Sequence, residues 1–134
     1  MAKAPSITVT VVTPEATLLD TTADFVALPL FDGEIGVALN HAPFIGRLGY
    51  GELRVVQGGA TSRYYIDGGF VQTADNVISV LTNHASPAEK IDAAVAREQL
   101  SSAQRKPATS DELLAQKQKL VEQARAKLRL AGKR

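Results

Sequence analysis

Apolar and polar residues alternate along the first 85 residues, in short runs that end at glycines, prolines and asparagines. The clearest run is 6–12, where Ile7, Val9 and Val11 share one face and serine and threonine side chains the other. A period of two is typical of a half-buried β-strand. Turn residues separate it from further short runs at residues 18–20, 24–28, 35–39, 44–48, 52–57, 61–66, 70–73 and 77–82. Short strands at this spacing predict an all-β sandwich or barrel of about ten strands.

The pattern changes at Ser86, where helical signals begin. The segment 86–89 has the form of a capping box with proline in the first helical position, which predicts a helix from Pro87 to about Arg105. Pro107 forces that helix to end. A second capping box at 109–112 predicts another helix that reaches Ala131 or Gly132.

The fold class expected from these signals is α+β in two parts. Residues 1–86 are predicted to form a β-sandwich domain, and residues 87–134 an antiparallel two-helix hairpin. The second helix carries an apolar stripe, interrupted by Lys117, that consists of Leu114, Val121, Ala124, Leu128 and Ala131. The first helix offers it few and small apolar partners: Ile91, Ala94, Val95 and Leu100. Such a contact buries little apolar area. Two interpretations therefore remain: an ordinary packed hairpin, or a hairpin loose enough for its helices to move away.

The segment from Leu28 to Leu48 departs most from regular alternation. Gly33 and Gly36 flank one acidic residue, Glu34, and two prolines and several apolar side chains lie in the same stretch. Apolar side chains in a turn-rich segment are costly to leave in water. Two interpretations follow: a buried corner of the sandwich, or an edge on which partner proteins dock. Glu34 has no cation near it in the sequence, which favours an exposed, partner-facing role.

Composition and charge narrow the class. The chain has 134 residues, 45% hydrophobic and 22% charged, as expected of a globular protein with one domain and an appendage. It has no cysteine, which excludes disulfides and thiolate sites. Residues 1–86 contain four basic and eight acidic residues, a net charge of −4, whereas residues 87–134 contain 11 basic and six acidic, a net charge of +5. This asymmetry suggests that the two parts face different partners.

Membrane insertion is not expected. No apolar run reaches the roughly 18 residues needed to span a bilayer. The first residues lack the apolar segment of a signal peptide, and we expect a chain that stays on the cytosolic side.

Catalytic constellations are absent from the sequence. The two histidines, His41 and His84, are far apart without carboxylates at ligand-like spacing, so neither a metal site nor a cofactor is expected. There is no G-x-S-x-G elbow, and the glycines match neither the dinucleotide fingerprint nor the phosphate loop. The basic second helix lacks interleaved aromatic residues, which favours a solvated or protein-facing charged surface over nucleic-acid binding. We therefore expect no enzymatic activity of this chain alone.

Several segments in register resemble the epsilon subunit of F-type ATP synthases, which is called delta in mitochondria. These are G-E-I-G-V-x-x-x-H-A-P at residues 33–43, Y-I-D-G-G-F-V at residues 65–71 and N-V-I-S-V-L at residues 76–81, followed by the helical hairpin. The resemblance covers essentially the whole chain. It implies a non-catalytic central-stalk subunit that couples rotation of the c-subunit ring to the catalytic head, peripheral on the cytoplasmic face of the bacterial inner membrane.

The same resemblance implies which residues meet partners. Contacts with the c ring and the gamma subunit are expected at Asp32, Glu34, Asn40 and His41. If the hairpin extends, its cations are expected to meet acidic segments of the alpha and beta subunits and to regulate ATP hydrolysis: Lys117, Lys119, Arg125, Lys127 and Arg129.

Two departures from the family pattern matter. Members that bind ATP in the hairpin carry I/L-D-x-x-R-A, and here Val95 stands in place of the arginine, so weak or no nucleotide binding is expected. Leu39-Asn40 replaces the usual Pro-Gly before His41. The alternative to the family interpretation is a stand-alone β-sandwich ligand-binding module with a helical dimerisation tail. Co-purification with a large ATPase would distinguish the two.

Overall fold

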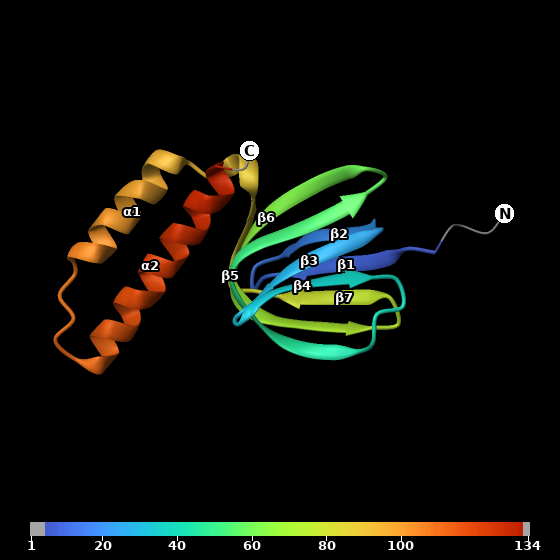
Figure 1. The fold of residues 1–134 in the computed structure, drawn as a ribbon, viewed down its shortest axis with the longest axis horizontal. Helices are drawn as coiled ribbons and strands as arrows, with labels where there is room; N and C mark the ends of the chain where they lie inside the picture. The colour runs from blue at the N-terminus through green and yellow to red at the C-terminus, as the bar shows by residue number, and fades with distance from the viewer. Residues whose placement is uncertain (1–4, 133–134) are drawn as a thin grey trace.

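The computed structural model describes residues 5–132. A β-sandwich lies at one end and two helices at the other (Figure 1). The elements in chain order are β1 (Ile7–Val12), β2 (Thr17–Ala23), β3 (Phe25–Leu30), β4 (Gly33–Ala38), β5 (Phe44–Gln57), β6 (Ala60–Ala74), β7 (Val77–Leu81), β8 (Ala85–Pro87), the 3₁₀ turn η1 (Ala88–Lys90), α1 (Ala93–Arg105) and α2 (Asp111–Gly132). The predicted α+β class, a sandwich followed by two helices, is confirmed.

The strands follow the order β2-β1-β7-β6-β5-β3-β4, with β8 paired to β6. All pairs are antiparallel except β1 with β7. Strands β5 and β6 are shared by both layers of the sandwich. Residues 69–73 of β6 pair with residues 44–48 of β5, and residues 70–74 of β6 pair with β7. Residues 54–56 of β5 pair with β3, and residues 64–66 of β6 pair with β8.

The structure has eight strands rather than about ten. Glycine-containing breaks that predicted turns, at residues 49–51 and 67–69, are bends inside two long strands of 14 and 15 residues. Gly69 shows why: its φ is +110°, and any side chain there would collide with the backbone carbonyl of Leu81. Glycine thus lets β6 bend while its ladder with β5 continues on both sides.

One apolar core lies between the two layers. The predicted inward positions of the first strand, Ile7, Val9 and Val11, are all buried. They belong to a cluster completed by residues from both layers: Ala23, Val26, Leu28, Val37, Leu48, Leu53, Val55, Ile66, Val71, Ile78, Val80 and Ala85. Period-two alternation therefore identified the buried face correctly.

The first helix begins later than predicted. Ser86 and Pro87 belong to β8, the segment 88–90 is a 3₁₀ turn, and α1 starts at Ala93. The cap is Asp92, whose carboxylate accepts hydrogen bonds from the backbone nitrogens of Ala94 and Val95 at 2.9 and 3.2 Å. Helix α2 is capped by Ser110, whose hydroxyl oxygen accepts from the Leu113 nitrogen at 3.1 Å, and ends at Gly132 as predicted.

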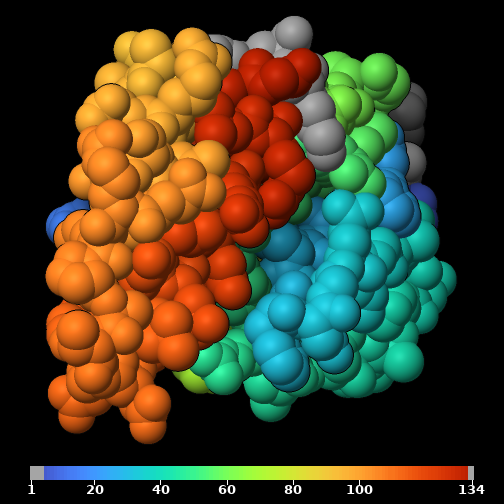
Figure 2. All heavy atoms as spheres, turned by 60° about the vertical axis from the view of Figure 1, so that its left-hand side comes forward, coloured from blue at the N-terminus to red at the C-terminus, as the bar shows by residue number. Residues whose placement is uncertain are grey.

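Helix α2 lies between α1 and the sandwich (Figures 1 and 2). It therefore needs two buried faces, and the single predicted stripe is wrong in part. Ala124 is buried, but Leu114 is exposed, and the other buried residues of α2 are Ala126 and Leu130. On α1 the buried residues are Ala96 and Ala103, whereas Val95 is exposed. The expectation of few and small helix–helix contacts holds, with different residues.

Candidate functional site

Glu34 lies at the start of β4 and pairs with Arg54 of β5. The Arg54 guanidinium donates two hydrogen bonds to its carboxylate, at 2.9 and 3.2 Å. No cation lies near Glu34 in the sequence, but β3 brings β4 and β5 together, so that Arg54 reaches Glu34 although the two residues lie 20 positions apart. About half of the Glu34 side chain is exposed, so the pair contributes about 0.2–1 kcal/mol. The carboxylate can still meet a partner if Arg54 is displaced.

The Glu34–Arg54 pair is one end of a row of charges across the outer face of the sheet. Arg54 also donates to Glu52, and Arg63 of β6 donates to the same carboxylate oxygen, both at 3.1 Å. Only 6% of the Glu52 side chain is exposed. Burial lowers the pKa of Arg54, but the hydrogen bonds to Glu34 and Glu52 outweigh it, and the net pKa is raised. Arg54 thus stays charged, and the row links β4, β5 and β6.

The other predicted contact residues lie in two places. Asp32 is exposed in the turn between β3 and β4, next to Glu34. Asn40 and His41 lie beyond the other end of β4, in the loop that leads to β5. The His41 ring meets the Phe44 ring edge-on at 5.3 Å, and its Nδ1 lies 2.8 Å from the Ala42 carbonyl oxygen. The four residues therefore form two groups, separated by the length of β4, rather than one site.

An exposed apolar face was missed by the sequence analysis. Ile45, Phe70, Val77 and Leu81 point outward from β5, β6 and β7, with between 42% and 76% of each exposed. Phe70 of β6 pairs with Leu81 of β7, and Val77 lies at the other end of β7, four residues before Leu81. A signal was present: Phe70, Val77 and Leu81 stand next to the buried Val71, Ile78 and Val80, so these strands are apolar on both faces. We call these four residues the apolar face.

The hairpin is held on the sandwich at a mixed apolar and polar contact, which we call the hairpin seat. Its apolar part joins Tyr65, Ala88 and Ile91 with Ala126 and Leu130 of α2. In its polar part, Asp67 Oδ1 accepts a hydrogen bond from the Tyr65 hydroxyl at 3.0 Å and from Gln123 Nε2 at 2.7 Å. Burial, then the charge of Asp67 and that hydrogen bond, raise the pKa of Tyr65.

The five predicted regulatory cations do not form one solvated face. Lys119, Arg125 and Arg129 are exposed, whereas Lys117 and Lys127 are half-buried. The Lys127 ammonium lies over the Tyr65 ring, 5.3 Å from its centre, and so belongs to the hairpin seat. Removing all five charges therefore also affects how the hairpin is held.

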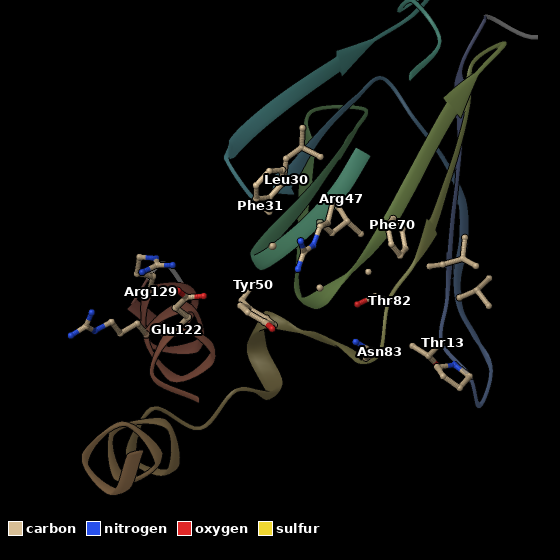
Figure 3. A pocket seen from close by; sticks show the side chains of 18 residues that line it. Thr13, Leu30, Phe31, Arg47, Tyr50, Phe70, Thr82, Asn83, Glu122 and Arg129 are labelled. Carbon is tan, nitrogen blue, oxygen red and sulfur yellow. The ribbon is translucent and has the colours of Figure 1, made fainter. Parts of the chain in front are cut away.

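A groove of about 1330 Å³ separates the end of the sandwich from the middle of α2 (Figure 3). Its walls carry Arg47, whose guanidinium lies 5.6 Å from the centre of the Phe31 ring, and Phe70 of the apolar face. On the helix side stand Arg125 and Arg129, with Glu122 as the one acidic residue of the lining. Three arginines against one glutamate give the groove a net positive charge, which suits an acidic segment of a partner protein.

Neither a metal site nor a membrane-spanning helix is found in residues 5–132. No group of three or more histidine and carboxylate side chains comes together there as metal ligands would. Neither helix combines the length and the apolar character that a bilayer crossing demands.

Residues 6–88 match the family model of the ATP synthase delta/epsilon chain, beta-sandwich domain. The chain belongs to this family. Its epsilon-chain relatives extend the match into the helices. The ATP synthase epsilon chain of Rhodopirellula baltica is 48% identical over 124 residues, which cover 92% of this chain and 97% of the relative. That of Anaeromyxobacter dehalogenans (strain 2CP-1) is 37% identical over 131 residues, which cover 96% and 99%. The resemblance noted from the sequence motifs is thus confirmed.

Solved structures agree with the family assignment. A chain in the cryo-EM structure of the Euglena gracilis mitochondrial ATP synthase, OSCP/F1/c-ring in rotational state 1, superposes with a TM-score of 0.83 at 25% identity, covering 93% of this chain and 81% of that one. A chain of the Tetrahymena thermophila mitochondrial ATP synthase central stalk/c-ring structure superposes with a TM-score of 0.75 at 13% identity, covering 97% and 99%. The second similarity concerns the fold alone.

Proposed function

We propose that this chain is a non-catalytic central-stalk subunit of an F-type ATP synthase, which couples rotation of the c ring to the catalytic head. Membership of the delta/epsilon family and the epsilon-chain relatives along nearly the whole chain support this role. The chain then lies on the cytoplasmic face of a bacterial inner membrane, attached through the complex.

The apolar face is the proposed docking surface for the gamma subunit, and it is the observation that carries the proposal. Four large side chains exposed together on neighbouring strands are costly in water unless a partner covers them. The groove continues this surface, since Phe70 and Leu81 line both. A partner segment with acidic residues is attracted to the three arginines beyond them.

The turn between β3 and β4 is the proposed contact with the c ring. Phe31 and Asp32 are exposed at its tip, and Glu34 follows at the start of β4. Because Glu34 already pairs with Arg54, contact with the ring means either an exchange of partner for Glu34 or a contact with the intact pair. Asn40 and His41, at the other end of β4, lie near the apolar face and are assigned to gamma.

The hairpin is the proposed regulatory element. In the present arrangement α2 rests on the sandwich through the hairpin seat, and the exposed cations Lys119, Arg125 and Arg129 are free to meet acidic surfaces. If the hairpin leaves its seat, all five cations face the alpha and beta subunits and oppose hydrolysis. Val95 supplies no donor for a phosphate, so this regulation is proposed to work without bound nucleotide.

The docking proposal is tested by placing a charge in the apolar face. Phe70→Asp and Leu81→Asp in the full chain are expected to abolish co-purification with gamma while leaving thermal unfolding nearly unchanged, because both side chains are largely exposed. Leu18→Asp is the matched control, since Leu18 is also a half-exposed leucine on an outer strand but lies outside the apolar face. Retained binding by both face variants, or equal loss with Leu18→Asp, would reject the docking surface.

A further inference from the structure

The apolar face ends at two connections that lie at the end of the sandwich away from the helices (Figure 1). Ile45 follows the loop 39–43, which joins β4 to β5, and Val77 follows the two-residue turn 75–76, which joins β6 to β7. The loop reaches β5 from β4, whereas the turn belongs to the part of the sheet beside β1. The β5–β6 and β6–β7 ladders place Ile45 and Val77 relative to each other. The loop 39–43 lies outside these ladders, so the position of His41 depends on how the loop is held against the turn.

Two asparagines join them directly. The Asn40 backbone nitrogen donates to Asn76 Oδ1 at 2.6 Å, and Asn76 Nδ2 donates in return to Asn40 Oδ1 at 3.3 Å. Both residues have left-handed backbones, with φ of 62° and 63°, a conformation that asparagine tolerates better than most residues. We call this reciprocal pair the asparagine clasp.

The turn is the fixed side of the clasp. The Asn76 carbonyl oxygen accepts a hydrogen bond from the Thr8 nitrogen at 2.8 Å, so β1 already anchors the backbone at Asn76. The Asn76 side chain is not needed for that bond. The loop has less support of its own, because its further backbone hydrogen bond runs from the His41 nitrogen to the Ala38 oxygen at 3.3 Å. The side chain of Asn76 thus fastens a weakly supported loop to a well-supported turn.

We propose that Asn76 is a positioning residue for gamma docking: through Asn40 it holds the loop that carries His41 and leads into Ile45. This inference rests on the proposed function of the apolar face. Asn76 does not need to touch gamma, and its effect passes through the backbone of Asn40. The clasp holds this loop beside the turn at the edge of the apolar face, so a partner meets a preformed loop rather than one that must be ordered on binding.

Three single substitutions in the full chain separate the clasp from backbone strain. Asn76→Gly keeps the left-handed turn accessible but removes the acceptor for the Asn40 nitrogen. Asn76→Asp keeps an acceptor oxygen at that position. Asp75→Gly makes the same change to glycine at the neighbouring left-handed residue of the turn, with φ of 53°, and leaves both bonds of the clasp in place.

The readouts are amide hydrogen exchange at Asn40 and His41 and the dissociation constant for the cognate gamma subunit. Asn76→Gly is expected to expose the Asn40 amide to exchange and to weaken gamma binding about fivefold, the loss that corresponds to one net hydrogen bond. Asn76→Asp and Asp75→Gly are expected to stay within about twofold of the unmodified chain in both readouts.

Loss of Asn40 protection in Asn76→Gly without weaker binding would overturn the positioning role, and so would equal weakening in Asp75→Gly. Unchanged protection in Asn76→Gly would show that the clasp does not hold the loop, and would overturn it too. If the unmodified chain does not bind gamma while its Asn40 amide is protected, both the proposed function and the positioning role are rejected. The hydrogen bonds between Asn40 and Asn76 would still be supported by the protection of the amide.

Discussion

Leu130→Ala tests whether the hairpin seat holds the helices on the sandwich. Leu130 is 2% exposed and contacts the apolar part of the seat around Tyr65. Truncating a fully buried leucine costs about 2–5 kcal/mol, because it removes apolar burial and leaves a cavity. At about 1.4 kcal/mol per factor of ten, hairpin opening should become about 30-fold to a few thousand-fold more favourable.

The matched control is Leu114→Ala, the same substitution in the same helix. Leu114 is 43% exposed, and alanine favours helix at least as well as leucine, so a change within about 0.5 kcal/mol is expected. Native-state hydrogen exchange of the full chain gives opening free energies for α2 and for the core strands β1 and β7 separately. Leu130→Ala should lower the values in α2 and leave those in β1 and β7 nearly unchanged.

Two results would refute this reasoning. If Leu130→Ala and Leu114→Ala lower α2 protection equally, the hairpin is not held through its seat. If Leu130→Ala lowers protection in β1 and β7 as much as in α2, the hairpin and sandwich unfold together, and residues 1–86 are not an independent folding unit.

Three further predictions concern charge. The pKa of Tyr65 is raised in the folded chain, so its proton stabilises the seat fully below the ordinary tyrosine pKa of about 10, and this contribution is lost as the pH rises above that value. Opening of α2, measured by hydrogen exchange, should therefore increase from about pH 10 in the unmodified chain. The increase should be smaller in Tyr65→Phe, which has no proton to lose there. Glu34→Lys places a cation beside Arg54 and should weaken coupling of proton flow to ATP synthesis with an intact circular dichroism spectrum; full coupling, or an unfolded variant, would contradict the c-ring assignment. Replacing the five cations of α2 by alanine should raise ATP hydrolysis of the complex and leave ATP synthesis nearly unchanged. A variant that replaces the other four and keeps Lys127 on the Tyr65 ring should have the same effect without loosening the hairpin seat. Unchanged hydrolysis at low salt would show that the hairpin has no regulatory role.

Local patterns in the sequence identified the strands of the core and the end of α2. Alternation predicted correctly that Val9 and Val11 are buried, because a strand with one face on the core shows a period of two whatever strands it pairs with. The end of α2 at Gly132 follows from local signals in the same way. The start of α1 was misplaced because Ser86 and Pro87 satisfy a strand pairing with Tyr64 and Tyr65, and a distant partner decided between two acceptable local structures.

The contacts of the candidate site could not be read from local patterns. Glu34 meets Arg54 only because β3 lies between their strands, and Lys127 meets Tyr65 only because the hairpin folds back on the sandwich. The asparagine clasp joins residues 36 positions apart that each look like ordinary turn formers. Such pairs depend on tertiary register, which a single sequence does not specify.

The pairing of β8 with β6 has a consequence for the mobility of the hairpin. Since β8 stays hydrogen-bonded to the sandwich up to Pro87 and α1 begins at Ala93, a hairpin that leaves its seat is tethered by residues 88–92 alone. Five residues reach at most about 17 Å when fully extended. A tether this short holds the free hairpin near its seat at an effective concentration on the order of millimolar. Return to the seat is therefore independent of the concentration of the protein, and a partner that keeps the hairpin away must itself be fixed to the same assembly.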